Sequence, residues 1–126
     1  MKAQLILIAG PYRGGTGGDP QLMAKNLLRL EEVALQVYQR GHLPLIGEWL
    51  ALPLASVAGS QRLGDKISEE FMYPLAHRLI QRCDAILRIA GESDGADNDV
   101  RVAQQQGIKV YYQLEEIANI NSLSPG

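Results

Sequence analysis

Short apolar runs alternate with amphipathic stretches along most of this chain. Residues 5–9 form a continuous apolar run, which predicts a strand buried on both faces. Beyond a glycine-rich stretch, apolar side chains recur at alternating steps of four and three from Met23 to Val37. This spacing predicts one long amphipathic helix, which Gly41 ends. Residues 42–46 then predict a short second strand.

The second half of the chain repeats this alternation. Apolar residues recur every fourth position over residues 67–79, which predicts another helix. Pro74 lies inside it, and because proline removes a backbone donor we expect either a kink or two short helices there. Residues 84–89 and 108–112 predict two further strands, with a helix over 97–106 between them.

Residues 47–65 follow neither the helical nor the strand period. They mix apolar side chains such as Trp49 and Val57 with glycine and proline. Such a segment forms a lid, a pocket wall or an oligomer surface, or it is an ordinary packed loop with one short helix. It carries few charges, and a domain of this size has limited room to bury its apolar side chains. We therefore expect a homo-oligomer with residues 47–58 at or near the contact.

The order of these elements predicts an α/β fold. Strands separated by helices form a parallel sheet, here of four to five strands, with helices on both faces. We expect residues 1–126 to form a single domain. Ligands of such sheets bind outside the carboxyl ends of the strands. Two glycine-containing turns, residues 10–18 and 91–96, fall at these ends, so we expect the functional site there.

Composition narrows the function classes. The chain has 126 residues, of which 46% are hydrophobic and 21% charged, as in ordinary globular proteins. Twelve basic and fourteen acidic residues form no basic stripe, which argues against a nucleic-acid polymer as partner. The single cysteine, Cys83, excludes a disulfide or a thiolate zinc site within one chain. No apolar run approaches the ~20 residues that span a membrane. We expect a cytoplasmic protein with neither metal nor cofactor.

The loop after the first strand is the first candidate site. Its sequence is Gly-Pro-Tyr-Arg-Gly-Gly, and backbone N–H groups near a helix start attract anions. Arg13 offers a planar fork for a phosphate or a carboxylate. The spacing is neither that of a Walker-type loop nor that of a dinucleotide fingerprint. Alternatively, the glycines only form a turn. The candidate residues here are Gly10, Tyr12, Arg13, Gly14 and Gly15.

An acidic cluster after the third predicted strand is the second candidate site. Asp94, Asp97 and Asp99 lie there together with Asn98. Such residues hold sugar hydroxyls, act as a base or provide a nucleophile. They equally suit the first turn of a helix, where the dipole favours acids. The EF-hand spacing is absent, which disfavours calcium. The candidate residues are Gly95, Asp97 and Asp99.

Three short motifs in this order resemble the nucleoside 2-deoxyribosyltransferase-like superfamily. They are the first strand ending in Gly-Pro-Tyr, Gly-His-x-Pro at 41–44, and Asp-Gly-Ala-x-x-Asp-Val-x-x-Ala at 94–103. Within that superfamily, this sequence most resembles the small members that consist of a domain of unknown function. Residues 13–15 also resemble the phosphate loop of the 2′-deoxynucleoside 5′-phosphate N-hydrolases. The resemblance spans residues 4–113.

The resemblance implies a flavodoxin-like sheet and a protein that cleaves or transfers N-glycosidic bonds. Its ligand would be a nucleoside or a nucleoside 5′-monophosphate. By position in the motifs, Asp99 would be the nucleophile on the anomeric carbon, Tyr12 would lie beside the sugar and Arg13 would contact the phosphate. Relatives also form oligomers whose pockets a neighbour completes, in line with the homo-oligomer expected above.

Two residues depart from the family pattern. The family has Glu where Asp99 stands, and an acid at the position of Ala76. Asp97 or Glu48 is a poor substitute for that second acid. We therefore expect hydrolysis of ordinary deoxynucleotides to be slow or absent. One alternative is a non-catalytic nucleotide-binding module of the same fold. Another is an interaction protein that uses the apolar segment 47–58.

Overall fold

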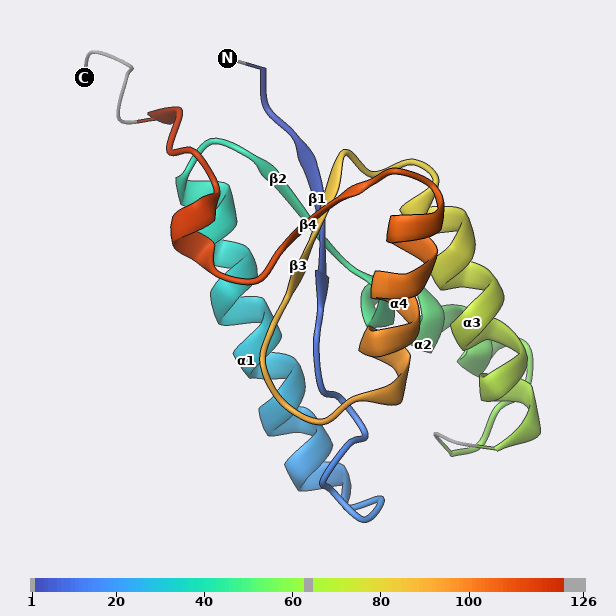
Figure 1. The fold of residues 1–126 in the computed structure, drawn as a ribbon. Coiled ribbons are helices and arrows are strands. Elements are labelled where there is room, and N and C mark those ends of the chain that lie inside the picture. Colours follow the sequence, from blue (N-terminus) through green and yellow to red (C-terminus); the bar gives the residue numbers. More distant parts are fainter. Residues whose placement is uncertain (1, 63–64, 122–126) are drawn as a thin grey trace.

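A parallel sheet runs through the centre of the protein (Figure 1). The computed structural model describes residues 2–62 and 65–121, and within these ranges the sheet has four strands in the order β2-β1-β3-β4. The strands are β1 (Leu5–Ala9), β2 (Leu43–Ile46), β3 (Ala85–Arg88) and β4 (Lys109–Tyr111). Every neighbouring pair is parallel. The α/β fold with a flavodoxin-like parallel sheet is confirmed.

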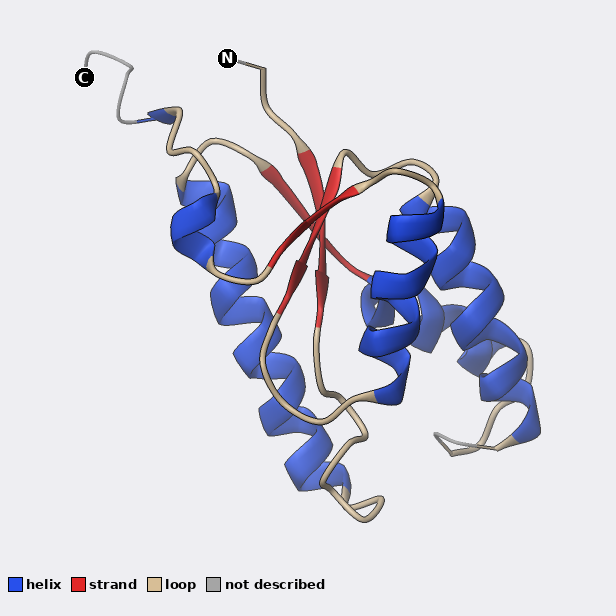
Figure 2. Cartoon of the chain, viewed as in Figure 1, coloured by secondary structure: helices blue, strands red, loops and turns tan. Residues whose placement is uncertain are grey.

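Helices cover both faces of this sheet, as Figure 2 shows. They are α1 (Pro20–Gln39), α2 (Gly47–Val57), α3 (Lys66–Ile80), α4 (Asp94–Gln105) and the short 3-10 helix η1 (Leu114–Glu116). Helix α1 and η1 lie on one side of the strands, and α3 and α4 lie on the other (Figure 2). Helix α2 follows β2 directly and packs on α3. None of the described helices is both long and apolar enough to cross a membrane.

The residues of β1 are buried because strands flank β1 on both sides and helices cover both of its faces. Ile6 and Ile8 pack in the cluster that includes Leu30 of α1. Leu7 belongs to the opposite cluster, with Ile80 of α3 and Val102 of α4. A continuous apolar run is the pattern expected of a strand that is buried on two faces. This prediction for residues 5–9 is confirmed.

Helix α3 differs from its prediction. It runs without interruption from Lys66 to Ile80 with Pro74 inside it, so a division into two short helices is wrong. Proline removes one backbone hydrogen bond, but α3 packs against both α2 and α4, and this packing outweighs the local cost. The side chain of Asp65 also caps the helix by accepting from the Ser68 N–H.

Helix α4 begins three residues earlier than the predicted 97–106. It starts at Asp94, because Ser93 is its N-cap and accepts a hydrogen bond of 3.0 Å from the Ala96 N–H. Within the predicted turn 91–96, residues 93–96 are therefore the cap and the start of the helix. This earlier start decides which acidic side chain of α4 faces the site.

A buried histidine joins the amino ends of β1 and β2 to the C-terminal segment. The Gln4 N–H donates to Nδ1 of His42 over 3.0 Å, and Nε2 of His42 lies 2.7 Å from the Ala118 carbonyl oxygen. Because Nδ1 accepts, Nε2 carries the proton and donates it to Ala118. His42 is only 3% exposed, so these two bonds are shielded from water.

We expect His42→Leu to destabilise the protein by about 1–3 kcal/mol, because the Gln4 N–H and the Ala118 carbonyl would lose their partner in a partly buried site. Urea unfolding measures this free energy. His77→Leu is the matched control, since His77 is exposed on α3. Equal stability of the two variants would show that the His42 hydrogen bonds contribute nothing.

Candidate functional site

A cavity of about 580 Å³ lies at the carboxyl-terminal edge of the sheet. The chain leaves β1 toward β2 on one side and later returns to β3 on the other, so the sheet has its topological switch point between β1 and β3. Open α/β sheets bind ligands at such a point. The cavity walls come from the end of β1 and the loop that follows it, from the start of α2, from α3, and from the start of α4. Its place agrees with the site expected from the two turns.

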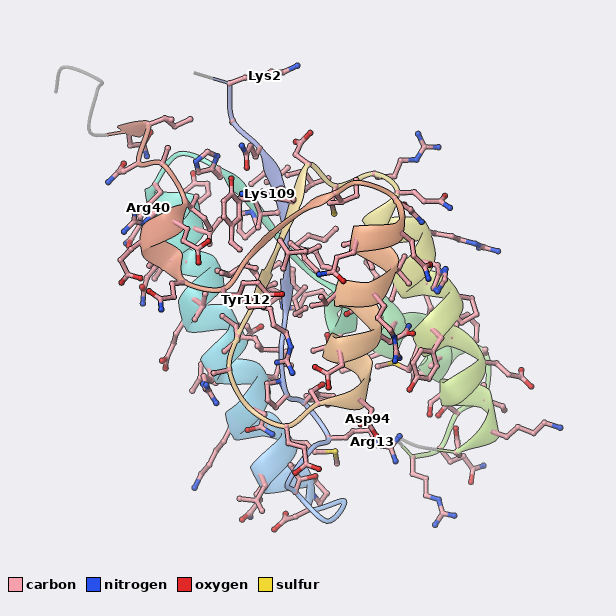
Figure 3. The ribbon with its side chains drawn as sticks, in the orientation of Figure 1. Lys2, Arg13, Arg40, Asp94, Lys109 and Tyr112 are labelled. Carbon is pink, nitrogen blue, oxygen red and sulfur yellow. The ribbon has the colours of Figure 1, made fainter. Side chains whose placement is uncertain are left out.

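Most of the sequence-predicted site residues line this cavity. The glycine loop after β1 and the first turns of α4 come together here although they are far apart in the sequence. Gly15 and Asp97 do not line the cavity. Arg13 and Asp94 lie at the same end of the molecule (Figure 3), and both are exposed at the rim of the cavity. The lining candidates are Gly10, Tyr12, Arg13, Gly14, Gly95 and Asp99.

The glycine loop packs tightly against the turn before α4. A Cβ at Gly14 would lie 2.3 Å from the Glu92 carbonyl oxygen, so no other residue fits here without a shift of the backbone. Asn26 of α1 donates to the Tyr12 carbonyl over 2.9 Å, and Thr16 Oγ1 donates to the Arg13 carbonyl over 2.6 Å. The loop is thus a fixed wall of the cavity. Asn26 could not be predicted from the sequence, because it lies among the polar residues of an ordinary amphipathic helix.

Arg88 fixes the turn between β3 and α4. Its guanidinium donates to the carbonyls of Ile89 and Gly91, and Nη2 pairs with Asp97 Oδ1 at 2.8 Å. From α1, Arg29 donates to the Ala90 carbonyl over 3.0 Å. Asp97, with 64% of its side chain exposed, therefore anchors this turn from outside the cavity. The role of substrate-binding residue predicted for Asp97 has no support in this geometry.

Besides the exposed rim residue Asp94, two partly buried carboxyl groups from different elements face the cavity. Asp99 lies in the second turn of α4, and Glu48 lies in the first turn of α2. Burial and, to a smaller extent, the negative charge of Glu48 raise the pKa of Asp99 to about 7, although Arg88 acts to lower it. Burial also raises the pKa of Glu48. Near neutral pH Asp99 is therefore partly protonated, whereas an exposed aspartate would be ionised.

Tyr12 completes this electrostatic cluster. Burial raises the pKa of its phenol, and the charge of Glu48 raises it as well, so the hydroxyl stays protonated and able to donate. Sequence analysis named Glu48 only as a poor second acid. The sequence offered little to place it, because α2 begins at Gly47 directly after β2 and no side chain caps it.

The opposite wall of the cavity is apolar. Four residues on one face of α3 supply it, at helical steps of three, one and three, together with Ala51 of α2. Tyr73 adds an aromatic ring that is 48% exposed. Ala76, which stands where the family resemblance expected an acid, is part of this wall. The α3 residues are Met72, Leu75, Ala76 and Leu79.

Comparison with known proteins adds no identification. No protein-family model matches the chain, and no curated protein or solved structure is significantly similar to it. Within the part of the chain that the structure describes, no three His, Cys, Asp or Glu side chains are grouped to hold a metal ion.

Asp99 makes the stability of the protein depend on pH. Its pKa is about 7 when folded, against an ordinary value of 3.8. Between these values the folded protein holds a proton that the unfolded chain has released, so the free energy of unfolding falls as pH rises through this range. We expect the Asp99→Asn variant to lack this contribution. Its free energy of unfolding should therefore fall less than that of the wild type between about pH 4 and about pH 8.

Urea unfolding across this pH range measures the difference. Asp94→Asn, which changes an exposed acid at the rim of the same cavity, should keep the wild-type fall. Parallel pH curves for wild type and Asp99→Asn would contradict the raised pKa.

Proposed function

We propose that this protein binds a nucleoside or nucleoside 5′-monophosphate in the cavity and cleaves or transfers its N-glycosidic bond. One observation carries the proposal: the Asp99 carboxyl, with a pKa of about 7, shares the cavity with the partly buried carboxyl of Glu48. Glycosidic cleavage needs a carboxylate at the sugar and a proton donor for the leaving group. The resemblance to deoxyribosyltransferase-like proteins assigns the sugar side to Asp99.

In this mechanism the pair reacts in the form in which Asp99 is ionised and Glu48 is protonated, and the Asp99 carboxylate attacks the anomeric carbon. The bond from that carbon to the base nitrogen breaks as the bond to an Asp99 oxygen forms, and the base takes a proton from the Glu48 carboxyl. Burial raises the pKa of Glu48, which favours the protonated form that this step requires. Water then attacks the glycosyl-Asp99 ester and returns a proton to Glu48. When a second base attacks in place of water, the reaction is a transfer.

The glycine loop suits the phosphate of a nucleotide. Arg13 is exposed at the cavity rim, where its guanidinium has room to form a fork onto a phosphate. Tyr12 is less exposed and within reach of the Glu48 charge, which supports a role for its hydroxyl beside the sugar. The loop stays fixed through its contact with Glu92, so it needs little ordering when a ligand binds.

A non-catalytic nucleotide-binding module is the second candidate. It is favoured by Ala76, which puts a methyl group where the family resemblance expects an acid. Asp99 is also one methylene shorter than Glu, a deficit of about 1.5 Å, and misplacement by about 1 Å already costs on the order of a hundredfold in rate. Binding without release of free base would favour this alternative.

We also propose that the protein is a homo-oligomer whose contact includes α2. This helix exposes 47% of Leu54 and 89% of Val57. Trp49, itself 39% exposed, donates to Glu31 of α1 over 2.8 Å, so the two helices are joined at the surface. Apolar side chains exposed next to each other are typical of an interface between subunits.

For catalysis, we expect slow release of free base from deoxynucleotides by the wild type and none by Asp99→Asn. The amide cannot form the glycosyl ester, whereas it fills the same space and should leave binding largely intact. Chromatography of the released base, with calorimetry for binding, measures both. Glu32→Gln, at an exposed position of α1, is the control. Unchanged turnover in Asp99→Asn would show that Asp99 only belongs to the early turns of its helix.

For the phosphate, Arg13→Ala should weaken binding of a nucleoside 5′-monophosphate by about 1.5–3 kcal/mol, the scale of hydrogen bonds to a charged group. The corresponding nucleoside should bind almost as before. Calorimetry on both ligands makes the comparison, and Lys25→Ala, at another exposed cation, is the control. An equal loss for both ligands would make Arg13 a structural residue.

For assembly, light scattering at micromolar concentration should give a mass above the 13.8 kDa of one chain for the wild type. The double substitution Leu54→Glu and Val57→Glu should shift the mass toward the monomer, because it places charges on the exposed face of α2. Tyr112→Glu changes an exposed residue beyond β4 and should leave the mass unchanged. A monomeric wild type would end this proposal.

A further inference from the structure

The cavity has two sides of opposite chemistry. Its titratable groups, Tyr12, Arg13, Glu48, Asp94 and Asp99, follow the strands β1, β2 and β3. The other side is the α3 wall, which we define as Met72, Leu75, Ala76 and Leu79. Apart from the rim residue Tyr73, no polar side chain of α3 in the described part of the chain lines the cavity.

The α3 wall stays partly exposed where it borders the cavity. Each of its four side chains is of intermediate burial, whereas Ile80, which follows Leu79 and faces the sheet, is fully buried. A ligand of nucleoside size in this cavity must therefore place one part against apolar carbon. That part gains van der Waals contacts and loses its hydration water, but it meets no side-chain hydrogen-bond partner on the wall itself.

The contrast between the titratable side of the cavity and the α3 wall affects which base the ligand can carry. With the sugar beside Asp99 and Tyr12, and the phosphate at the rim near Arg13, the remaining group to be placed is the base. A base edge with exocyclic amino or carbonyl groups would leave them without partners on the α3 wall, which disfavours binding. A base edge made of hydrocarbon groups would instead strengthen binding by about fourfold for each buried methylene-sized group.

We propose that the site selects nucleosides whose base presents an apolar, alkyl-bearing edge to the α3 wall. The inference rests on the proposed function, because that function places the sugar at the acids. It makes Ala76 a specificity-determining residue, since an acid at this position would put a charge on the wall. It also fits a slow reaction with the deoxynucleotides of adenine, guanine and cytosine, whose base edges carry exocyclic polar groups.

Three 2′-deoxyribosides with the same sugar test the proposal: 2′-deoxyadenosine, benzimidazole 2′-deoxyriboside and 5,6-dimethylbenzimidazole 2′-deoxyriboside. The ring edge becomes more apolar along this series. We expect the affinity measured by calorimetry to rise in the same order, by about tenfold or more from the first compound to the last. If 2′-deoxyadenosine binds as tightly as the dimethyl compound, the inference is wrong and the proposed function stands. If none of the three binds, both are wrong.

Variants locate the preference on the wall. Met72→Gln keeps the length of the side chain but adds an amide, so it should reduce the gain from the two methyl groups and change 2′-deoxyadenosine binding little. Ala76→Ser is a second, milder variant with the same expectation. Leu43→Gln, at an exposed position at the opposite end of β2, is the control. An undiminished preference in both wall variants would overturn the assignment to α3.

Discussion

The site depends on the pairing of β1 with two parallel neighbours. Leu7 is in register with Leu45 of β2 on one side and with Ile86 of β3 on the other. Because the strands are parallel, their carboxyl ends reach the same edge of the sheet together. The residues just beyond these ends, Tyr12, Glu48 and the start of α4, therefore meet around one cavity. A sheet without this pairing would separate them.

Burial determines the protonation of the cavity acids, although several other effects oppose it. Asp99 lies near the start of α4, where the helix dipole favours a negative charge, and Arg88 is close enough to lower its pKa. Yet its pKa is about 7, because burial and the charge of Glu48 outweigh both. Arg88 binds Asp97 and two backbone carbonyls, so its guanidinium is already engaged outside the cavity. The arginine thus shapes the turn more than it neutralises Asp99.

The sequence allowed the sheet, most helices and the location of the cavity to be predicted, because those depend on periodicity and on where strands end. It did not allow α2 to be predicted. This helix buries Ala51 and Ala55 while it exposes larger side chains such as Leu54 and Val57. Small residues inside and large ones outside reverse the usual amphipathic pattern. The spacing of the apolar residues therefore does not show which face of the helix is buried. The same limit hides Glu48, whose position depends on where α2 begins.

The acids of α4 show a related limit. Asp97 and Asp99 are two residues apart, so their side chains point about 200° apart around the helix. One anchors Arg88 from outside and the other lines the cavity. Composition alone treats them as equal members of one acidic cluster. Only the exact start of the helix, which the Ser93 cap fixes at Asp94, separates their roles.

That fixed start also links the two proposals. The backbone that carries Asp99 is held by the Ser93 cap and by the hydrogen bonds of Arg88, so the shorter side chain of Asp cannot be offset by a shift of α4. The sugar must instead approach Asp99, and how far it does so depends on how the base rests against α3. A base that fits the α3 wall would hold the anomeric carbon near Asp99, whereas a poorly fitting one would leave the gap open. On this view the apolar wall controls both affinity and reaction, because the same contact sets the distance over which the carboxylate must act.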